Sequence, residues 1–222
     1  MKTSTPVLLS GLLLPAWLLA GFLALWTLAA IHPHSRQDWF LENIPVFVAV
    51  PILAGTSRRF RFTDGAYVLI AAFLVLHCIG AHYTYSEVPL GNWLREVRPL
   101  ALARNHYDRF VHFAFGLLLV RPVRELMAGL GVRRGCQSVL AIHVLMAWSG
   151  LYEILEGTVA GIVSPELGAA YNGSQGDAWD AQKDMALALV GALLGVLPGV
   201  VTHGVRAWVA FRAQTTNRPY AE

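Results

Sequence analysis

Charged side chains are scarce in this chain. Asp, Glu, Lys and Arg make up 14% of its 222 residues, whereas hydrophobic residues make up 55%. A soluble domain usually carries roughly 25% charged residues, so the composition excludes a soluble protein. Six membrane spans of about 20 residues, joined by short loops, would use the whole length. We therefore predict one integral membrane domain over residues 1–222.

Cysteine is also rare, with only Cys78 and Cys136 in the chain. Two cysteines cannot supply a cysteine metal framework. The apolar runs place them in opposite halves of the membrane, so we expect no disulfide between them. Any chemistry of this chain must come from other side chains.

The net charge of +3 at pH 7 does not indicate nucleic-acid binding. The arginines stand in short loops beside apolar runs, which is the topology signal of a protein with several spans. Such loops are also attracted to anionic lipid headgroups. The partners that the charge pattern predicts are membrane lipids, and not nucleic acid.

Six apolar runs give the predicted spans, and the fold class is all-α. The spans cover residues 6–31, 43–56, 65–85, 106–120, 137–163 and 179–203. The first run is longer than the roughly 7–15 residues of a signal-peptide core, so we interpret it as a span. Residues 32–42 are interpreted as a polar loop, and residues 87–104 as a connector with an interfacial helix around Trp93.

The basic residues assign the two sides of the membrane. Arginines gather after the second and fourth spans and in the C-terminal tail, whereas the loop after the fifth span has neither Lys nor Arg. Cytoplasmic loops carry the excess of Lys and Arg. This pattern predicts a bundle of six transmembrane helices with both termini in the cytoplasm.

Acidic and histidine side chains gather at the outer ends of the last four predicted spans. The candidates are His82, His106, Asp108, His112, Glu153, Glu156, Asp177, Asp180 and Asp184. Several of them stand three or four residues apart, which places each pair on one helical face. We expect the carboxyls of Asp108, Glu153 and Asp184 to lie within about 10 Å of one another, the reach of one shared ion or water shell.

Carboxylates at this depth must be protonated, paired with a base or bound to a cation. Carboxylates and imidazole groups from facing helices form the metal sites of helix bundles, and this donor set fits zinc, manganese or iron. Simpler roles remain open. Asp177, Asp180 and Asp184 could favour a helix N-terminus, and Asp108 could pair with Arg109.

Glycine repeats at four-residue spacing on the last two predicted spans. They are Gly157 and Gly161 on the fifth span, and Gly191, Gly195 and Gly199 on the sixth. Small residues at this spacing let two helices approach closely in a membrane. The repeats therefore predict helix packing and not a binding site.

The motif Asn-His-Tyr-Asp-Arg-Phe-Val-His-Phe at residues 105–113 resembles the YjdF-like family of bacterial inner-membrane proteins. The resemblance extends to residues 82–86, to Glu153 and Glu156, and to residues 176–185. Residues 172–176 read Asn-Gly-Ser-Gln-Gly where the family pattern has Leu-Gly-Thr-Gln-Gly. The resemblance implies a multi-pass protein of the bacterial inner membrane, and no established activity.

A second and weaker similarity is to the VanZ-like proteins, which are linked to glycopeptide antibiotic tolerance. It is carried by residues 108–113, and by Asp184 followed by Gly-Ala-Leu-Leu-Gly at residues 191–195. Likeness at this level transfers no chemistry.

The first functional hypothesis is a membrane-embedded, metal-dependent hydrolase acting on a lipid, a lipid-linked precursor or an envelope metabolite. Its metal ligands are Asp108, His112, Glu153, Asp180 and Asp184, and its bases or positioning groups are His82, His106 and Glu156. The alternatives are a small cation- or proton-coupled transporter and a structural membrane protein without chemistry. A transporter needs ionisable groups through both leaflets, whereas the inner half has few besides His143.

The topology can be tested by cysteine labelling in a background that lacks Cys78 and Cys136. Ser174→Cys should react with an impermeant thiol reagent added outside the cell, because residues 170–176 are expected outside. Ser57→Cys, beside the arginines, should stay unlabelled. The reverse pattern would contradict both the topology and an outward-facing site.

Overall fold

In the computed structural model, the backbone is described for residues 7–97 and 103–216, and the side chains for residues 13–97 and 103–198. Within these ranges the chain forms nine α-helices and no strand, which confirms the all-α class. They are α1 (Val7–Ala29), α2 (Arg36–Glu42), α3 (Ile44–Thr56), α4 (Asp64–His82), α5 (Pro89–Glu96), α6 (Tyr107–Gly129), α7 (Arg134–Ala160), α8 (Pro165–Asn172) and α9 (Asp180–Thr216). Pro6, where the first span was expected to begin, lies outside the described residues.

Three helices are long and apolar enough to cross a membrane: α4, α7 and the Asp180–Pro198 part of α9. A fourth span results if α2 and α3, which meet at a bend of 42°, are counted together. Within the described residues, α1 is a shorter apolar helix over Leu13–Ala29. The interfacial helix expected around Trp93 is α5.

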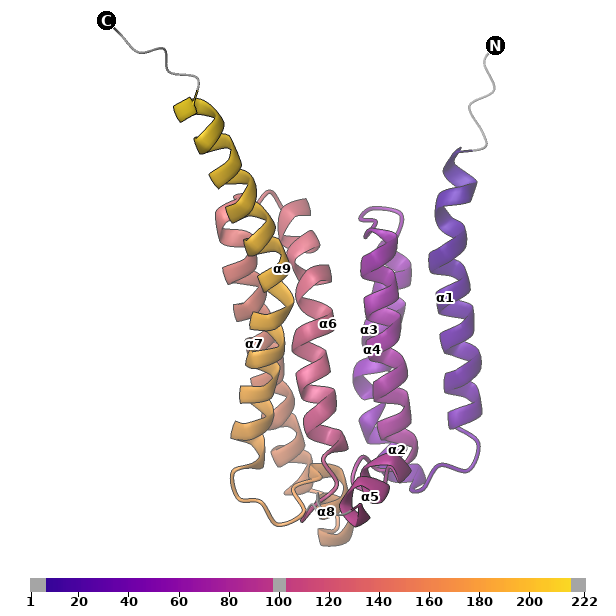
Figure 1. The fold of residues 1–222 in the computed structure, drawn as a ribbon. Coiled ribbons are helices and arrows are strands. Elements are labelled where there is room, and N and C mark those ends of the chain that lie inside the picture. The colour runs from indigo at the N-terminus through magenta and orange to yellow at the C-terminus, as the bar shows by residue number, and fades with distance from the viewer. Residues whose placement is uncertain (1–6, 98–102, 217–222) are drawn as a thin grey trace, which may run out of the picture.

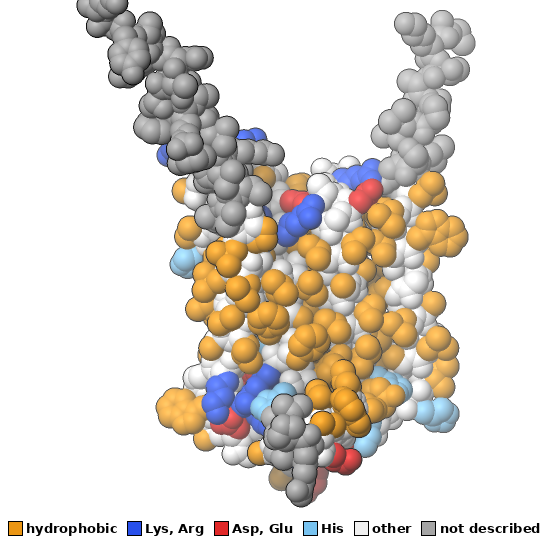
Figure 2. Space-filling view, in the orientation of Figure 1, with side chains coloured by type: hydrophobic (Ala, Val, Ile, Leu, Met, Phe, Trp, Pro, Cys, Tyr) orange, Lys and Arg blue, Asp and Glu red, His pale blue; other side chains and the backbone are white. Residues whose placement is uncertain are grey.

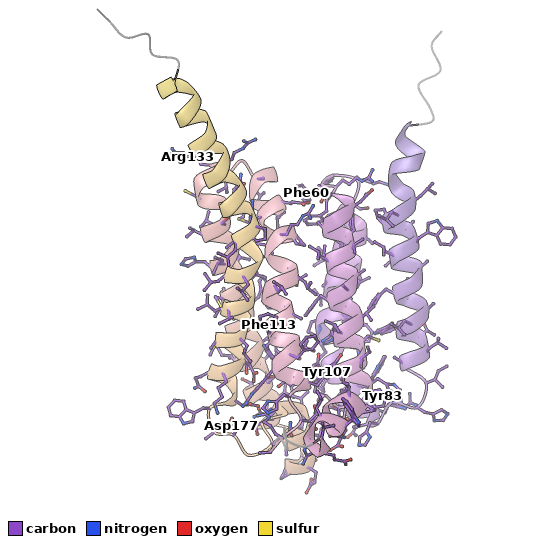
Figure 3. The ribbon with its side chains drawn as sticks, in the orientation of Figure 1. Phe60, Tyr83, Tyr107, Phe113, Arg133 and Asp177 are labelled. Carbon is purple, nitrogen blue, oxygen red and sulfur yellow. The ribbon has the colours of Figure 1, made fainter. Side chains whose placement is uncertain are left out.

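The long helices stand side by side, and the short helices α2, α5 and α8 gather at one end of them (Figure 1). We call this end the site end. The first described residue of α1 and the last residue of α9 lie toward the opposite end, with Phe60 and Arg133 (Figures 1 and 3). We call it the arginine end. Tyr83, Tyr107 and Asp177 lie at the site end (Figure 3).

On the face drawn in Figure 2, an apolar belt crosses the middle of the molecule, and charged side chains appear above and below it. Large apolar side chains such as Trp17, Trp148 and Leu193 are exposed in the described structure. Monomeric soluble proteins rarely expose contiguous apolar surface of this kind. The surface is that of a protein whose sides face lipid.

Two helix ends differ from the predicted spans for local reasons. Helix α4 ends at His82, before the expected residue 85, because Thr84 and Tyr85 adopt positive φ values of 58° and 39°. Helix α6 continues past residue 120 because Arg121 bonds Glu125 one turn later, with Nε 3.3 Å from Oε1. Such i,i+4 pairs support a helix on its exposed face.

Helices α6 and α9 pack with almost no space between their backbones. A Cβ added at Gly116 would lie 1.9 Å from the Ala188 carbonyl oxygen, and one at Gly191 would lie 2.1 Å from that of Phe113. Only glycine fits at either position. The close packing predicted for Gly191 is therefore confirmed. Gly157 does not repeat it, since a Cβ there would meet nothing within 4 Å.

This difference gives a matched pair of substitutions. Gly116→Ala should lower the free energy of unfolding by about 1–3 kcal/mol, because α6 and α9 would have to separate. Gly157→Ala should be neutral or stabilising by about 0.5–1 kcal/mol, because it only improves helix propensity. Thermal melting in detergent measures both. Equal melting temperatures for the two variants would contradict the close contact.

Candidate functional site

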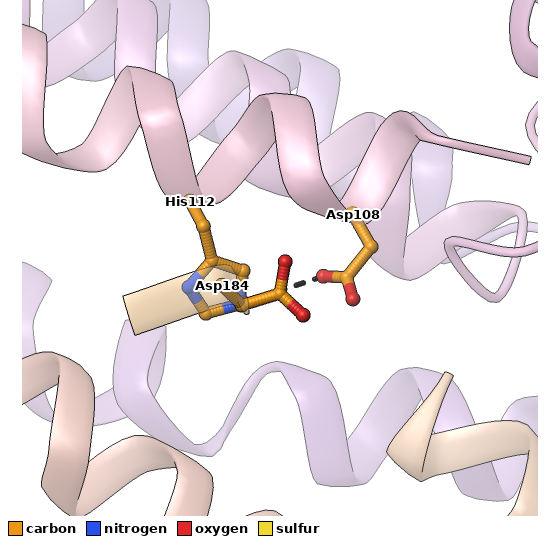
Figure 4. Close-up of side chains that lie close together, drawn as sticks. All are labelled: Asp108, His112 and Asp184. Atoms are coloured by element: carbon orange, nitrogen blue, oxygen red, sulfur yellow. Dashed lines mark ion pairs between the residues drawn. The ribbon is translucent and has the colours of Figure 1, made fainter. Parts of the chain in front are cut away.

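The centre of the candidate site is formed by Asp108 and His112 on α6 and by Asp184 on α9. One ligand atom from each of the three lies within 4.8 Å of the others (Figure 4). His112 Nε2 is 3.6 Å from Asp108 Oδ1, as expected for residues one turn apart on a helix. Asp184 is 2% exposed, and its Oδ1 has no hydrogen-bond partner among the described residues. The donor set is thus two carboxylates and one imidazole.

Helix α7 adds two further carboxyls to this centre. Glu153 Oε1 lies 3.5 Å from His112 Nε2 and has no hydrogen-bond partner in the described structure. Glu156 is buried one turn later and lies against Glu153. Asp108 and Glu153 approach the same imidazole nitrogen, so their carboxyls are within roughly 7 Å of each other. The expected proximity of Asp108, Glu153 and Asp184 is confirmed, whereas their role as ligands stays a prediction.

Asp180, the remaining predicted ligand, is held by arginines. Its carboxylate pairs with Arg104 and with Arg109, whose Nη2 is 3.0 Å from Oδ1. Arg109 also reaches Asp177 at 2.5 Å, so it pairs with α9 and its preceding loop rather than with its neighbour Asp108. The hydrogen bond from Lys183 lowers the pKa of Asp177 below its usual range. Asp180 therefore has its charge balanced without a metal ion.

Asn105 connects the loops of the site end through hydrogen bonds. It is fully buried, and it exchanges hydrogen bonds with the side chain of Gln175, 3.0 Å from its N–H and 2.9 Å from its carbonyl. Its own amide donates to Val88 O, and its Oδ1 accepts from Tyr107 N. A Cβ at Gly91 would lie 1.8 Å from that Oδ1, so glycine is required there.

The structure does not bring His82 and His106 to this centre. His82 Nδ1 donates to the Ala29 carbonyl at 2.8 Å, which ties α4 to α1. His106 is the N-cap residue of α6 and is half-buried near Arg104 and Arg109. Neither belongs to the group formed by Asp108, His112 and Asp184. A role for them as bases stays a prediction that the geometry does not support.

Sequence reasoning missed two acids, Asp38 and Glu42. Residues 32–42 were expected to form a polar loop, but residues 36–42 form α2, and its two acids are 0% and 2% exposed. Tyr152 on α7 donates its hydroxyl to Glu42 Oε2 at 2.8 Å. The available signal was Ser35, which caps the helix by accepting from Asp38 N, followed by acids at i,i+4 spacing.

The acids of the site end outnumber its bases. In the described structure, the ion pairs formed there by Lys and Arg all go to Asp177 or Asp180. The acids there that are buried or half-buried and lack such a pair are Asp38, Glu42, Asp108, Glu153, Glu156 and Asp184. Buried carboxylates need a proton, a base or a cation. The arrangement can therefore hold positive charge.

Comparison with known proteins agrees with a membrane location. Residues 14–204 match the family described as "Predicted membrane protein (DUF2238)". The chain belongs to this family. It is also 37% identical over 169 residues to a protein of Escherichia coli strain K12 named "Inner membrane protein YjdF", covering 75% of this chain and 79% of that protein. No solved structure matches the chain.

These matches bear on the motifs of the site. The family match spans all the residues of the candidate centre, from Asp108 to Asp184, and both acids of α2. The family resemblance predicted from residues 105–113 is confirmed. The family description and the name of the relative state a location and no activity, so the function must be argued from the site.

His106 gives a pH-dependent prediction. Burial, followed by the charges of Arg109 and Arg104, lowers the pKa of His106 below its ordinary 6.5. As the pH falls below 6.5, His106 is therefore protonated in the unfolded chain before it is protonated in the folded chain. Stability from this group is full above pH 6.5 and is lost as pH falls through the folded pKa.

The measurement is the melting temperature of wild type and His106→Gln in detergent at pH 7.5 and pH 5.5. Wild type should lose more stability than the variant over this interval, because glutamine does not titrate. An identical pH dependence for both proteins would contradict the lowered pKa.

Proposed function

We propose that this protein is an inner-membrane metalloprotein, and that its activity is hydrolysis of a lipid or envelope substrate at the site end. The observation that carries this proposal is the meeting of Asp108, His112 and Asp184 within 4.8 Å, with an unpartnered carboxylate oxygen on Asp184. A buried acceptor without a partner costs free energy. A bound divalent ion removes that cost.

The residues present fit such an ion. Asp108, His112 and Asp184 would hold it, and Glu153, 3.5 Å from His112, would be a fourth ligand. Mixed carboxylate and imidazole ligands suit zinc, manganese or iron. When bound, a divalent ion polarises a carbonyl or phosphoryl oxygen and favours deprotonation of water.

The protein's own groups would supply the rest of the reaction. Glu156 is buried against Glu153, where it can accept the proton of an attacking water. Arg104 and Arg109 stand at the edge of the centre, held by Asp180. They would attract an anionic headgroup or phosphate, because guanidinium groups match those anions.

The proposed topology has six spans, with both termini in the cytoplasm and the site end outside. The arginine end carries the turns around Phe60 and Arg133, whereas Asp177 lies at the opposite end (Figure 3). The buried acids of the candidate site also lie at that opposite end. This separation supports the positive-inside assignment. The substrate would then be a lipid, a lipid-linked molecule or another envelope metabolite, reached from the outer leaflet.

One observation favours hydrolysis over transport. The described core between α6, α7 and α9 toward the arginine end is apolar, with Val120, Ala141, Leu145, Ala192 and Val196. A path for cations or protons needs polar groups through both halves of the membrane. The apolar core supports a site that opens at one end only.

The test is the metal content of wild type and Asp184→Asn, purified in detergent without chelator after metal repletion. Wild type should hold about one equivalent, and Asp184→Asn should lose 10-fold or more in affinity, because asparagine keeps the shape and removes the charge. Asp64→Asn is the control, since Asp64 is exposed and pairs with Arg61 at the arginine end. It should keep the metal.

Two outcomes would contradict the proposal. Substoichiometric metal in repleted wild type would leave a protonated polar cluster as the better account. Full metal content without hydrolysis of labelled membrane lipids, together with cation flux in proteoliposomes, would favour the transporter. Thermal melting of each variant shows whether it is folded.

A further inference from the structure

Asp38 and Glu42 form a second acidic cluster that the proposed hydrolysis does not use. They lie four residues apart on α2, which packs against α8 and α4 at the site end. Asn43 secures the bend that follows, since its Nδ2 donates to Trp39 O at 2.7 Å and its Oδ1 accepts from Trp26 Nε1 at 2.6 Å. These hydrogen bonds fix the turn that follows α2, and therefore also the position of its two acids.

Several oxygens around this pair are buried without a hydrogen-bond partner in the described structure. They are both carboxylate oxygens of Asp38, the hydroxyl of Thr84 and the hydroxyl of Tyr171. Thr84 is 4% exposed and faces Asp38. Tyr171 is buried near Glu42 and Asp38. Thr84 lies within reach of Asp38 and Tyr171 within reach of Tyr152, so small rotations can satisfy the two hydroxyls. They still leave at least one oxygen of the Asp38 carboxylate without a partner. A buried, unmade hydrogen bond costs roughly 1–3 kcal/mol, which indicates a missing partner.

The side chains around Asp38 and Glu42 that could bind an ion all offer oxygen atoms. The nearby imidazole, His77, has both ring nitrogens engaged: Nε2 donates to the Glu42 carbonyl at 3.0 Å, and Nδ1 accepts from the Tyr85 hydroxyl at 2.6 Å. The Tyr152 hydroxyl donates to Glu42 Oε2 and leaves the other oxygen of that carboxyl available to an ion. Oxygen-only sites prefer hard cations such as Ca²⁺ and Mg²⁺.

We propose that Asp38 and Glu42 form a second cation site, which binds a hard divalent ion with the hydroxyl of Thr84. Two carboxylates carry the charge that one divalent ion balances, and no Lys or Arg pairs with them among the described residues. The site is distinct from the centre at Asp108, His112 and Asp184, and it does not depend on hydrolysis. Its donor set excludes imidazole, whereas that of the centre includes it.

The two sites share helix α7. Tyr152 contacts Glu42, and the next residue, Glu153, contacts His112. The rings of Tyr152 and His112 are 6.3 Å apart. An ion at Asp38 and Glu42 would therefore fix α2 against α7 beside the centre, which gives it a structural role.

The experiment is thermal melting of the full chain in detergent, after chelator treatment, with CaCl2 or MgCl2 added. Wild type should gain about 5 °C at saturation, because the ion binds only the folded state. Asp38→Asn and Glu42→Gln should lose this gain. Asp184→Asn should keep it, which separates this proposal from that of the centre. Glu96→Gln, an exposed acid at the same end, should also keep it.

Thr84→Val is a milder variant, which removes one hydroxyl without a change of shape. It should raise the half-saturating ion concentration about 10-fold. The proposal is overturned if wild type gains nothing with either ion, or if Asp38→Asn gains as much as wild type.

Discussion

Buried carboxylates without basic partners are the constraint on which the site end depends. A carboxylate removed from water loses several kcal/mol of solvation unless a proton, a base or a metal ion compensates. Asp180 is compensated by Arg104 and Arg109. In the described structure, the one basic side chain that lies next to the carboxyls of Asp108, Asp184 and Glu153 is His112. This contrast within one end of the molecule divides acids that organise loops from acids that are free to bind a cation.

Glycine places the free acids opposite one another. Gly116 lies one helical turn after His112, and Ala188 lies one turn after Asp184, and these two residues meet where the backbones of α6 and α9 touch. Residues one turn from such a contact share its helical faces. Asp184 must therefore face His112 across the interface. The close packing of the two helices and the geometry of the centre are one feature of the fold.

Much of this was predictable from the sequence, because helical spacing decides which residues share a face. The acids and histidines of α6, α7 and α9 were expected at one end, and the structure brings Asp108, His112, Glu153 and Asp184 together. Spacing does not give the rotation of one helix relative to another. Arg109 was weighed as a partner of Asp108 beside it, and it instead pairs with Asp177 and Asp180 across the interface.

The composition of residues 36–42 does not indicate that α2 is buried. Trp39 stands in the segment that was expected to be a polar loop, but it is 8% exposed and its ring centroid is 5.3 Å from that of Trp26. A short polar segment after His32 and Pro33 resembles a loop until other helices cover it. Whether a polar residue is solvated depends on tertiary contacts, and the local pattern records only its neighbours along the chain.

The two acidic clusters also belong to one electrostatic unit. Consecutive residues on a helix point about 100° apart, so Tyr152 and Glu153 direct α7 toward different neighbours, Glu42 on one side and His112 on the other. In a medium of low dielectric constant, charges interact strongly over several ångströms. Carboxylates at one cluster raise the cost of ionising those at the other, and a cation at either lowers it. The acids of α2 therefore bear on the charge of the centre even though they lie outside it.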